Sequence, residues 1–595
     1  MNKKDFERLK KYSQIHLIDN LDSFDEKKQE IGYVYLDNYI SNKKEYFKKF
    51  EKKNNLFLFS WQYFRRGYLT TLADLKSYQN IDDFYKRFEK KNFLLIKFFK
   101  FLYQSEKFEI ALKKNILVKL KNQYEVKIIK RVISFITKKK VLENLSYKEL
   151  INNDNKGQIK NYFRRAFIFF LYPFYISFKN KFVFKPTKTF FTNYYRIYEN
   201  GAGVRNLGNL DWLIENEKKI EKKDIFVLED IDHKRSRHTN ELIKNNFNFI
   251  DCNNRIQSGY ISFAELIKYI IFLAPLGVFL SIYLLFFKKT FFIFFYQSWL
   301  SYFKWSNFIK FNSGKNYIVY HNYQDDHVLR NIFLKKNNFN LIHYKHTSSE
   351  NIFNYKIKDK YNNAHQAFLY YDKEFHQTKQ SVEMSEQNNS LSSEKIICGP
   401  TFNIKKKLNI LMKKKQICFF NSSFTDGHAA NPIESHFNFL RFIDSFLKRS
   451  DFKVILKSKR KIETYENYDP TFENLINSMK KNKNLNIIDY DLDLNEIINL
   501  SEISIHMPFS STGVISLGLK KKFFFYDSLN FFRNSYFSKF DKLKLISTSE
   551  TENYEFLDFY SKIEQSEYEE YIDDCFLETF GDHYDNSVNI IKKYL

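Results

Sequence analysis

The chain has 595 residues, with 96 Lys and Arg against 69 Asp and Glu and a formal net charge of +27. This length predicts roughly two to four domains with material for large cores. The four cysteines are widely separated and have neither Cys-x-x-Cys nor Cys/His ligand spacing, so neither a disulfide framework nor a standard zinc site is expected. A reducing cytoplasm fits this cysteine usage. The first residues, MNKKDFERLKKYSQ, are charged, and no secretory signal is expected there.

The surplus of positive charge has two interpretations. It favours a negatively charged partner such as nucleic acid, anionic lipid or an acidic glycan. Codon bias of an AT-rich genome would produce the same excess of Lys, Asn, Ile, Phe and Tyr beside only 14 Gly and 7 Pro. The lysines are dispersed in short runs and no nucleic-acid-binding motif is present. We therefore expect an anionic membrane surface as partner and no nucleic acid.

The first 150 residues show mainly helical patterns. Apolar residues recur at three- and four-residue spacing over 84–103 and 110–136, which predicts two helices. The run LFLFSW at 56–61 instead predicts a buried strand, which leaves a second, small α/β unit open. We expect a mainly helical, basic N-terminal region over 1–195, of unknown role.

An apolar run at 269–287, YIIFLAPLGVFLSIYLLFF, has 19 residues without a charge and is followed by two lysines. This length is near the minimum for a bilayer span, and Pro275 and Gly277 favour a kink. We expect a re-entrant or interfacial segment within a membrane-facing insertion over about 260–312. A buried core helix is an equal alternative, ahead of a full crossing. A shorter run at 167–178, FIFFLYPFYISF, is expected either to dip into lipid headgroups or to form a buried helix.

The region 196–400 is expected to be a first α/β half, because strand and helix patterns alternate in it. Two stretches carry the pattern: GNLDWLIENEKKIEKKDIFVLED at 208–230 and YIVYHNYQDDHVLRNIFLKKNNFNLIHYKHTSS at 317–349. Polar clusters follow the strands of the second stretch. They comprise His321, Asp325, Asp326 and His327, and then His343, His346, Thr347 and Ser348.

The region 401–595 is expected to be a second α/β half. Short strands are predicted at 416–421, 453–457, 485–488, 503–507 and 523–526, with helical stretches between them. Strands and helices that alternate at this spacing predict a parallel sheet, whose ligands bind outside the carboxyl ends of the strands. A third polar cluster, Asp426, His428 and Glu434, follows the first of these strands.

The segment 503–527, ISIHMPFSSTGVISLGLKKKFFFYD, carries the clearest functional motif. A strand runs into a Pro-Phe-Ser-Ser-Thr-Gly turn and a new helix, whose first N–H groups and dipole favour an anion such as phosphate. The residues expected to bind this group are Lys457, Lys459, Pro508, Ser510, Ser511, Thr512, Gly513 and Asp527. Ser and Thr at this position are also ordinary helix caps, and that alternative stays open.

These motifs resemble the two-domain, GT-B-type glycosyltransferases of bacterial surface-polysaccharide biosynthesis, whose relatives transfer acidic sugars or glycerol phosphate. The resemblance covers about 200–595. It implies an α/β fold of two Rossmann-like halves, with the acceptor side in 196–400 and the nucleotide donor in 401–595. It also implies a nucleotide-sugar donor, a glycan or lipid-linked acceptor and a location at the cytoplasmic face of the inner membrane.

The resemblance further implies a general base between the two halves. Asp326 is the first candidate, His346 the second, and Asp426 or His428 the third, with His321, His327, Thr347 and Ser348 on the acceptor side. Basic side chains and a helix N-terminus are expected to stabilise the leaving nucleotide without an essential metal or other cofactor. Asp491 and Asp493 have metal-clamp spacing but are interpreted as a helix cap. A non-catalytic scaffold or glycan-binding protein of the same fold is the alternative function.

Overall fold

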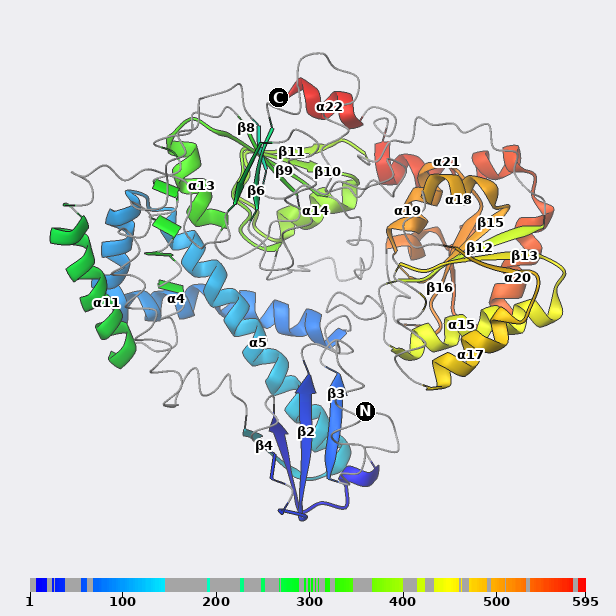
Figure 1. Ribbon diagram of the computed structural model, residues 1–595, viewed down its shortest axis with the longest axis horizontal. Helices are drawn as coiled ribbons and strands as arrows, with labels where there is room; N and C mark the ends of the chain where they lie inside the picture. The colour runs from blue at the N-terminus through cyan, green and yellow to red at the C-terminus, as the bar shows by residue number, and fades with distance from the viewer. Residues whose placement is uncertain are drawn as a thin grey trace.

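The described part of the protein contains three parallel β-sheets (Figure 1). The computed structural model describes residues 7–18, 24–25, 27–37, 55–60, 68–144, 190–192, 225–229, 248–251, 267, 269–287, 294–295, 298–299, 301–302, 305–306, 309, 316–320, 327–345, 366–399, 415–422, 433–459, 462, 470–488, 494–508, 510–530, 536–581 and 587–594. Within these residues, the sheets have four strands in the order β3-β2-β1-β4, seven in the order β11-β10-β9-β8-β5-β6-β7, and six in the order β14-β13-β12-β15-β16-β17.

The four-stranded sheet lies near the N-terminus. Its strands are β1 (Gln14–Ile18), β2 (Ile31–Asp37), β3 (Leu56–Ser60) and β4 (Lys140–Asn144). Their apolar side chains pack against Val126, Ile129 and Ile133, in the second half of the helix α5 (Phe108–Thr137). The strand expected at 56–61 is confirmed as β3. The region therefore combines long helices with the small α/β unit that the sequence left open.

The helices α4 (Tyr68–Tyr103) and α5 form a hairpin that packs against the seven-stranded half (Figure 1). One hydrophobic cluster joins buried residues of both helices to residues between Ala274 and Tyr371. The Tyr103 hydroxyl donates to the carbonyl of Ser298 at 2.5 Å, and Lys336 Nζ donates to the Tyr103 carbonyl at 2.7 Å. The domain boundary expected at 195 stays a prediction, but the core of the first half extends to this hairpin.

The first α/β half contains the seven-stranded sheet. Its strands are β5 (Phe190–Thr192), β6 (Ile225–Glu229), β7 (Asn248–Asp251), β8 (Asn316–Tyr320), β9 (Asn340–Tyr344), β10 (Lys373–His376) and β11 (Glu394–Ile397). The helices α13 (His327–Lys336) and α14 (Lys379–Gln387) connect neighbouring strands at β8–β9 and β10–β11. The α/β class expected for this half is confirmed.

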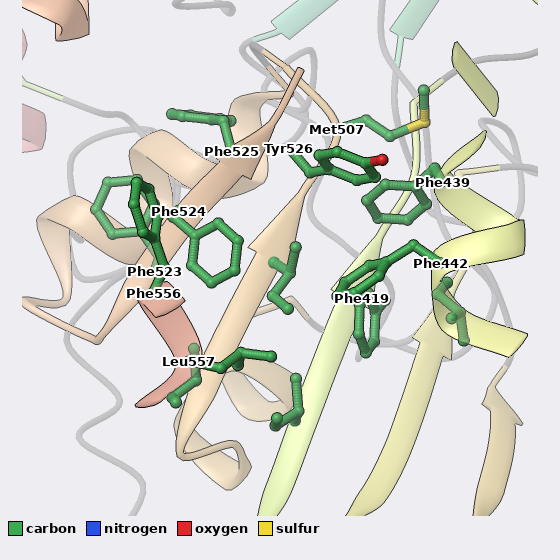
Figure 2. Packing of buried hydrophobic residues seen from close by; sticks show 14 of the residues in the cluster. Phe419, Phe439, Phe442, Met507, Phe523, Phe524, Phe525, Tyr526, Phe556 and Leu557 are labelled. Carbon is green, nitrogen blue, oxygen red and sulfur yellow. The ribbon is translucent and has the colours of Figure 1, made fainter. Parts of the chain in front are cut away.

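The second α/β half contains the six-stranded sheet. Its strands are β12 (Gln416–Phe420), β13 (Lys453–Lys457), β14 (Leu485–Ile488), β15 (Ile503–His506), β16 (Phe523–Tyr526) and β17 (Ile546–Ser547). The helices are α15 (Ile433–Arg449), α17 (Pro470–Lys480), α18 (Leu494–Leu500), α19 (Ser511–Gly518), α20 (Glu550–Lys562) and α21 (Gln565–Phe580). The strands are almost wholly apolar because helices cover both faces of the sheet. Figure 2 shows aromatic residues of β12, β16 and α15 packed together in this core.

The C-terminal helix α22 (Ser587–Lys593) returns to the first half (Figure 1). Asn340 Nδ2 donates to the carbonyl of Tyr594 at 3.3 Å, and the rings of Phe375 and Tyr594 lie 5.7 Å apart. The C-terminal segment thus braces the first half through Asn340 and Phe375.

The apolar run at 269–287 forms a π-helical turn, η5 (Tyr269–Leu273), followed by the helix α11 (Ala274–Phe287). Gly277 of α11 lies under the Trp299 indole, where an added Cβ would come within 2.8 Å of the ring. Within the part of the chain that the structure describes, no helix has the length and apolar character needed to cross a bilayer. A membrane-facing role for this segment stays a prediction, and the run at 167–178 lies outside the described residues.

Candidate functional site

The carboxyl edge of the six-stranded sheet is the candidate binding site. In the strand order, β12 has β13 on one side and β15 on the other, so the chain reverses its direction of winding between β12 and β15. Ligands of open α/β sheets bind in the crevice at this kind of switch point. Asn421 and Ser422 follow β12 there, and the turn with Ser510 follows β15. The predicted donor-binding turn therefore lies at the position that the topology favours.

A buried histidine fixes this turn. His506, the last residue of β15, is fully buried and stacks on Phe420 with ring centroids 4.9 Å apart. Its Nδ1 lies 2.8 Å from Thr512 Oγ1, and its Nε2 lies 2.9 Å from Ser504 Oγ and 3.1 Å from Ser516 Oγ. Burial lowers the pKa of His506 to about 3, so the ring is neutral near pH 7. The sequence interpretation missed this residue, although a lone His beside Ser504 in an apolar strand is a usable signal.

The hydroxyls of the turn are not equivalent. Ser510 Oγ lies 2.6 Å from Thr512 Oγ1, so both hydroxyls belong to the His506 network. Ser510 occupies the N-cap position of α19, but its side chain makes no cap hydrogen bond. Among the described residues, no hydrogen-bond partner is found for the half-buried Ser511 hydroxyl. Ser511 is therefore the turn hydroxyl best placed to meet a ligand.

Gly513 has a structural reason to be glycine. An added Cβ would lie 2.3 Å from Cζ and 2.4 Å from Cε1 of Phe525. Phe525 itself is fully buried in β16 and shares the core in Figure 2. The glycine lets α19 pack closely on β16, and a phosphate is not needed to explain it.

The neighbouring strand ends are tied together by polar contacts. Asn421 Nδ2 donates to Ser458 Oγ at 2.8 Å, and the Lys459 N–H donates to Asn421 Oδ1 at 2.9 Å. These contacts join the ends of β12 and β13 next to the switch point. Asn438 of α15 donates to Ser528 Oγ at 3.4 Å, beyond the end of β16. A rigid polar rim results, which the sequence interpretation did not identify.

The predicted donor-binding residues differ in exposure at this rim. Lys459 is exposed, whereas Lys457 is only 3% exposed and lies in the interior at the end of β13. Pro508 and Asp527 are also buried. Ser511 and Lys459 are thus the predicted residues most open to a ligand, while Lys457, Pro508 and Asp527 shape the strand ends. Their role in donor binding stays a prediction.

Most of the predicted catalytic and acceptor-side residues lie outside the described residues: Asp326, His346, Asp426, His428, His321, Thr347 and Ser348. His327 is described as the first residue of α13, where it is buried and stacks on Tyr371 at 5.5 Å. His343 stacks on Tyr371 at 4.9 Å, and Arg330 donates to the Tyr371 hydroxyl at 3.2 Å. The structure therefore places His327 in a packed aromatic cluster of the first half and does not present it to a substrate.

The first half contains a second polar cluster that the sequence interpretation missed. Glu374 of β10 is fully buried and accepts hydrogen bonds from Ser385 and Ser392 at 2.5 Å and from Ser390. His376 Nε2 lies 3.2 Å from the same carboxylate. Burial by itself raises the pKa of Glu374, but the contact with His376 and the charges of His343 and Lys345 together outweigh it and hold that pKa well below its usual value. Burial lowers the pKa of His376 to about 4. This cluster ties β10 to the segment around α14.

Metal ligands do not gather in the described part of the molecule. Among these residues, no group of three or more His, Cys, Asp or Glu side chains is arranged to hold a metal ion. Asp491 and Asp493 lie outside them, directly before α18.

Comparison with solved structures gives similar chains at low identity. A glycosyltransferase from Rickettsia africae has 11% identity and a TM-score of 0.38, over 69% of this chain and 98% of that one. HepE from Anabaena, solved with UDP and glucose, has 9% identity and a TM-score of 0.38, over 69% and 100%. A variant of the wall teichoic acid polymerase TagF has 11% identity and a TM-score of 0.39, over 74% and 97%. Likeness at this level does not establish an activity.

Sequence comparison gives one informative match. No curated protein matches the chain. Residues 300–553 match the model of the family described as polysaccharide biosynthesis PFTS motif protein. The matched range runs from before β8 to within α20 and includes the whole β15–α19 turn. The resemblance to a polysaccharide biosynthesis family is thereby confirmed, and residues 300–553 carry the sequence pattern of that family.

Proposed function

We propose that the protein is a membrane-associated glycosyltransferase, or a transferase of glycosyl phosphate, in the biosynthesis of a bacterial surface polysaccharide. The donor is a nucleotide-activated sugar, and the acceptor is a glycan or a lipid-linked glycan. The protein acts at the cytoplasmic face of the inner membrane. The match of residues 300–553 to a polysaccharide biosynthesis family is the observation that carries this proposal.

The donor site of this proposal is the carboxyl edge of the six-stranded sheet. The nucleotide phosphates lie at the first turn of α19, where the helix N-terminus and the Ser511 hydroxyl offer hydrogen bonds. The exposed Lys459, at the end of β13, adds positive charge to the same edge. These groups stabilise the charge that grows on the leaving nucleotide, so the reaction needs no essential metal or other cofactor. Asp326 remains the first candidate for the base, followed by His346, Asp426 and His428.

The experiment is nucleotide binding by the full-length protein, measured by isothermal titration against uridine, cytidine and guanosine nucleotides and their sugar conjugates. The variant is Ser511→Asp. A carboxylate in the first turn of a helix suits the helix dipole, so the fold is retained. It also occupies the phosphate position with like charge, and affinity for the preferred nucleotide falls by about tenfold or more.

The matched control is Ser566→Asp, in the first turn of α21, where Ser566 is exposed. It introduces the same charge at another helix N-terminus and leaves affinity unchanged. A folded wild-type protein that binds no nucleotide would overturn the donor site. Equal nucleotide affinity of the wild type and Ser511→Asp would show that the nucleotide does not bind at this turn.

A non-catalytic scaffold of the same fold is the second candidate, and one observation favours it. The residue types of the turn also have a structural explanation, because Ser510 and Thr512 bond within the His506 network and Gly513 accommodates Phe525. Under this alternative, glycans bind to the full-length protein while nucleotides do not.

A further inference from the structure

The exposed surface of α4 contains large apolar side chains in its second half. Phe93, Leu94 and Phe101 are 54%, 80% and 78% exposed. With Lys97 they occupy positions i, i+1, i+4 and i+8, which share one face of a helix. The opposite face, with Leu95, Ile96 and Phe99, is buried in the core of the first half. The exposed side chains are therefore not part of this core.

The helix α11 and the turn η5 have a similar apolar face. Ile271, Phe272, Phe279 and Ile282 are 46–68% exposed, at spacings that bring them to one side of the segment. The other side, with Ala274 and Gly277, is buried beneath Trp299. This helix is thus fixed to the protein by one face and exposes a wholly apolar one.

The two exposed faces belong to neighbouring elements. Trp299 packs on Gly277 of α11 and stacks on Phe98 of α4, with ring centroids 6.3 Å apart. Phe98 directly follows Lys97, and Figure 1 shows α11 beside α4 at one end of the molecule. We call the exposed residues Phe93, Leu94, Lys97, Phe101, Ile271, Phe272, Phe279 and Ile282 the apolar–basic surface.

Positive charge surrounds these apolar side chains. Between residues 84 and 103, α4 carries five cationic residues, Lys86, Arg87, Lys90, Lys91 and Lys97, beside one acidic residue, Glu89. A sixth, Lys100, is ion-paired with Glu106 and Glu109 and does not add to this charge. Lys97 Nζ lies 5.1 Å from the centre of the Phe93 ring, so a positive charge lies directly beside the apolar face. Protein–protein interfaces are depleted of Lys. Helices that lie in the headgroup region combine Lys and Arg with Phe and Leu in this manner.

We propose that the apolar–basic surface docks the protein on a bilayer that contains anionic phospholipid. Phe and Leu side chains insert among the acyl chains, and the lysines contact lipid phosphates. This inference specifies the membrane location of the proposed function and is independent of the transfer chemistry. It adds α4 to the membrane-binding surface. The apolar run at 269–287 alone did not indicate that α4 takes part.

The test is sedimentation of the full-length protein with vesicles of phosphatidylcholine, with and without phosphatidylglycerol. Wild-type protein binds the anionic vesicles, and binding falls in high salt because the charges are screened. Two variants, Phe93→Ser/Leu94→Ser/Phe101→Ser and Phe272→Ser/Phe279→Ser, each reduce binding by about tenfold or more. The control Leu391→Ser/Leu577→Ser changes two exposed leucines elsewhere and binds as wild type does.

Three outcomes would overturn the proposal. One is equal binding of all variants, and another is binding to neutral vesicles that salt does not weaken. The third is a wild-type oligomer that becomes monomeric in the surface variants without any lipid binding, which would make the surface an interface between copies. Nucleotide affinity of the same variants is measured in parallel. Loss of lipid binding with unchanged nucleotide affinity separates this inference from the donor site.

Discussion

Gly513→Ala tests whether packing or ligand approach requires the glycine in the β15–α19 turn. The added Cβ would lie 2.3 Å from Phe525 Cζ and 2.4 Å from Cε1. Carbon atoms in contact prefer about 3.5–4.0 Å, so the ring must move by more than about 1 Å. Phe525 is fully buried, with the rings of Phe523 and Phe537 5.6 Å and 5.4 Å away, and it cannot shift alone.

The expected magnitude has two parts. Overpacking of a close-packed core costs about 1–3 kcal/mol. Replacing glycine by alanine in a helix stabilises the folded state by up to about 1 kcal/mol, because alanine has the higher helix propensity. We expect a net loss of roughly 1–2 kcal/mol. For a unit of 150–250 residues this lowers the melting temperature by about 2–8 °C.

The assay is differential scanning calorimetry of the full-length protein, with Ser511→Ala in the same helix as a control that should shift the transition only slightly. Phe525→Leu is then added to Gly513→Ala. The smaller side chain leaves room for the Cβ, so the double variant loses less stability than the two single changes together. If Gly513→Ala melts at or above the wild-type temperature, packing does not require the glycine. Close approach of a ligand would then be the better explanation.

Three further predictions concern His506, Glu374 and Tyr594. Because the pKa of His506 falls to about 3 on folding, its contribution to stability is present above about pH 6.5 and is lost as the pH falls toward 3. Acidification to pH 5 costs roughly 2 kcal/mol, and His506→Gln flattens the profile of melting temperature against pH in this window. An unchanged profile contradicts the assignment. Glu374→Gln lowers the free energy of unfolding by about 2–4 kcal/mol, because the hydroxyls of three serines lose their carboxylate acceptor. The change is measured as a lower melting temperature. The exposed control Glu394→Gln has little effect, and equal shifts would refute the reasoning. Tyr594→Ala loosens the C-terminal brace on Phe375 by roughly 1 kcal/mol. Limited proteolysis should then release the C-terminal helix sooner, and an unchanged cleavage rate would argue against this brace.

Much of the second half could be predicted from the sequence. The strands at 453–457, 485–488 and 523–526 have the bounds that the structure shows for β13, β14 and β16. Short apolar runs separated by helical stretches are a local signal, and a parallel sheet is the arrangement that buries both of their faces. The first strand of the N-terminal sheet, by contrast, begins at the polar Gln14 and was not predicted.

The sequence predicted where the candidate site lies along the chain, but not the contacts that its side chains make. The Ser-Ser-Thr-Gly turn is visible as a motif, but the sequence does not show which hydroxyl is already bonded. Thr512 meets His506 only because α19 folds back over the end of β15, and Gly513 is restricted by a ring twelve residues later in the chain. The sequence did not show that Lys457 and His327 are buried, because burial depends on which elements cover a strand end or a helix start.

The sequence by itself determined the α/β class, the order of strands and helices in the second half and the match of residues 300–553 to a family model. These properties follow from hydrophobic periodicity and turn chemistry, which act over a few residues. Only the tertiary structure decided that β12 and β15 are neighbours, that Glu374 is surrounded by serines, and that α4 and α11 both pack against Trp299. Such contacts join residues up to about two hundred positions apart. They depend on how side chains fit together and are buried in the core, which the local sequence pattern does not show.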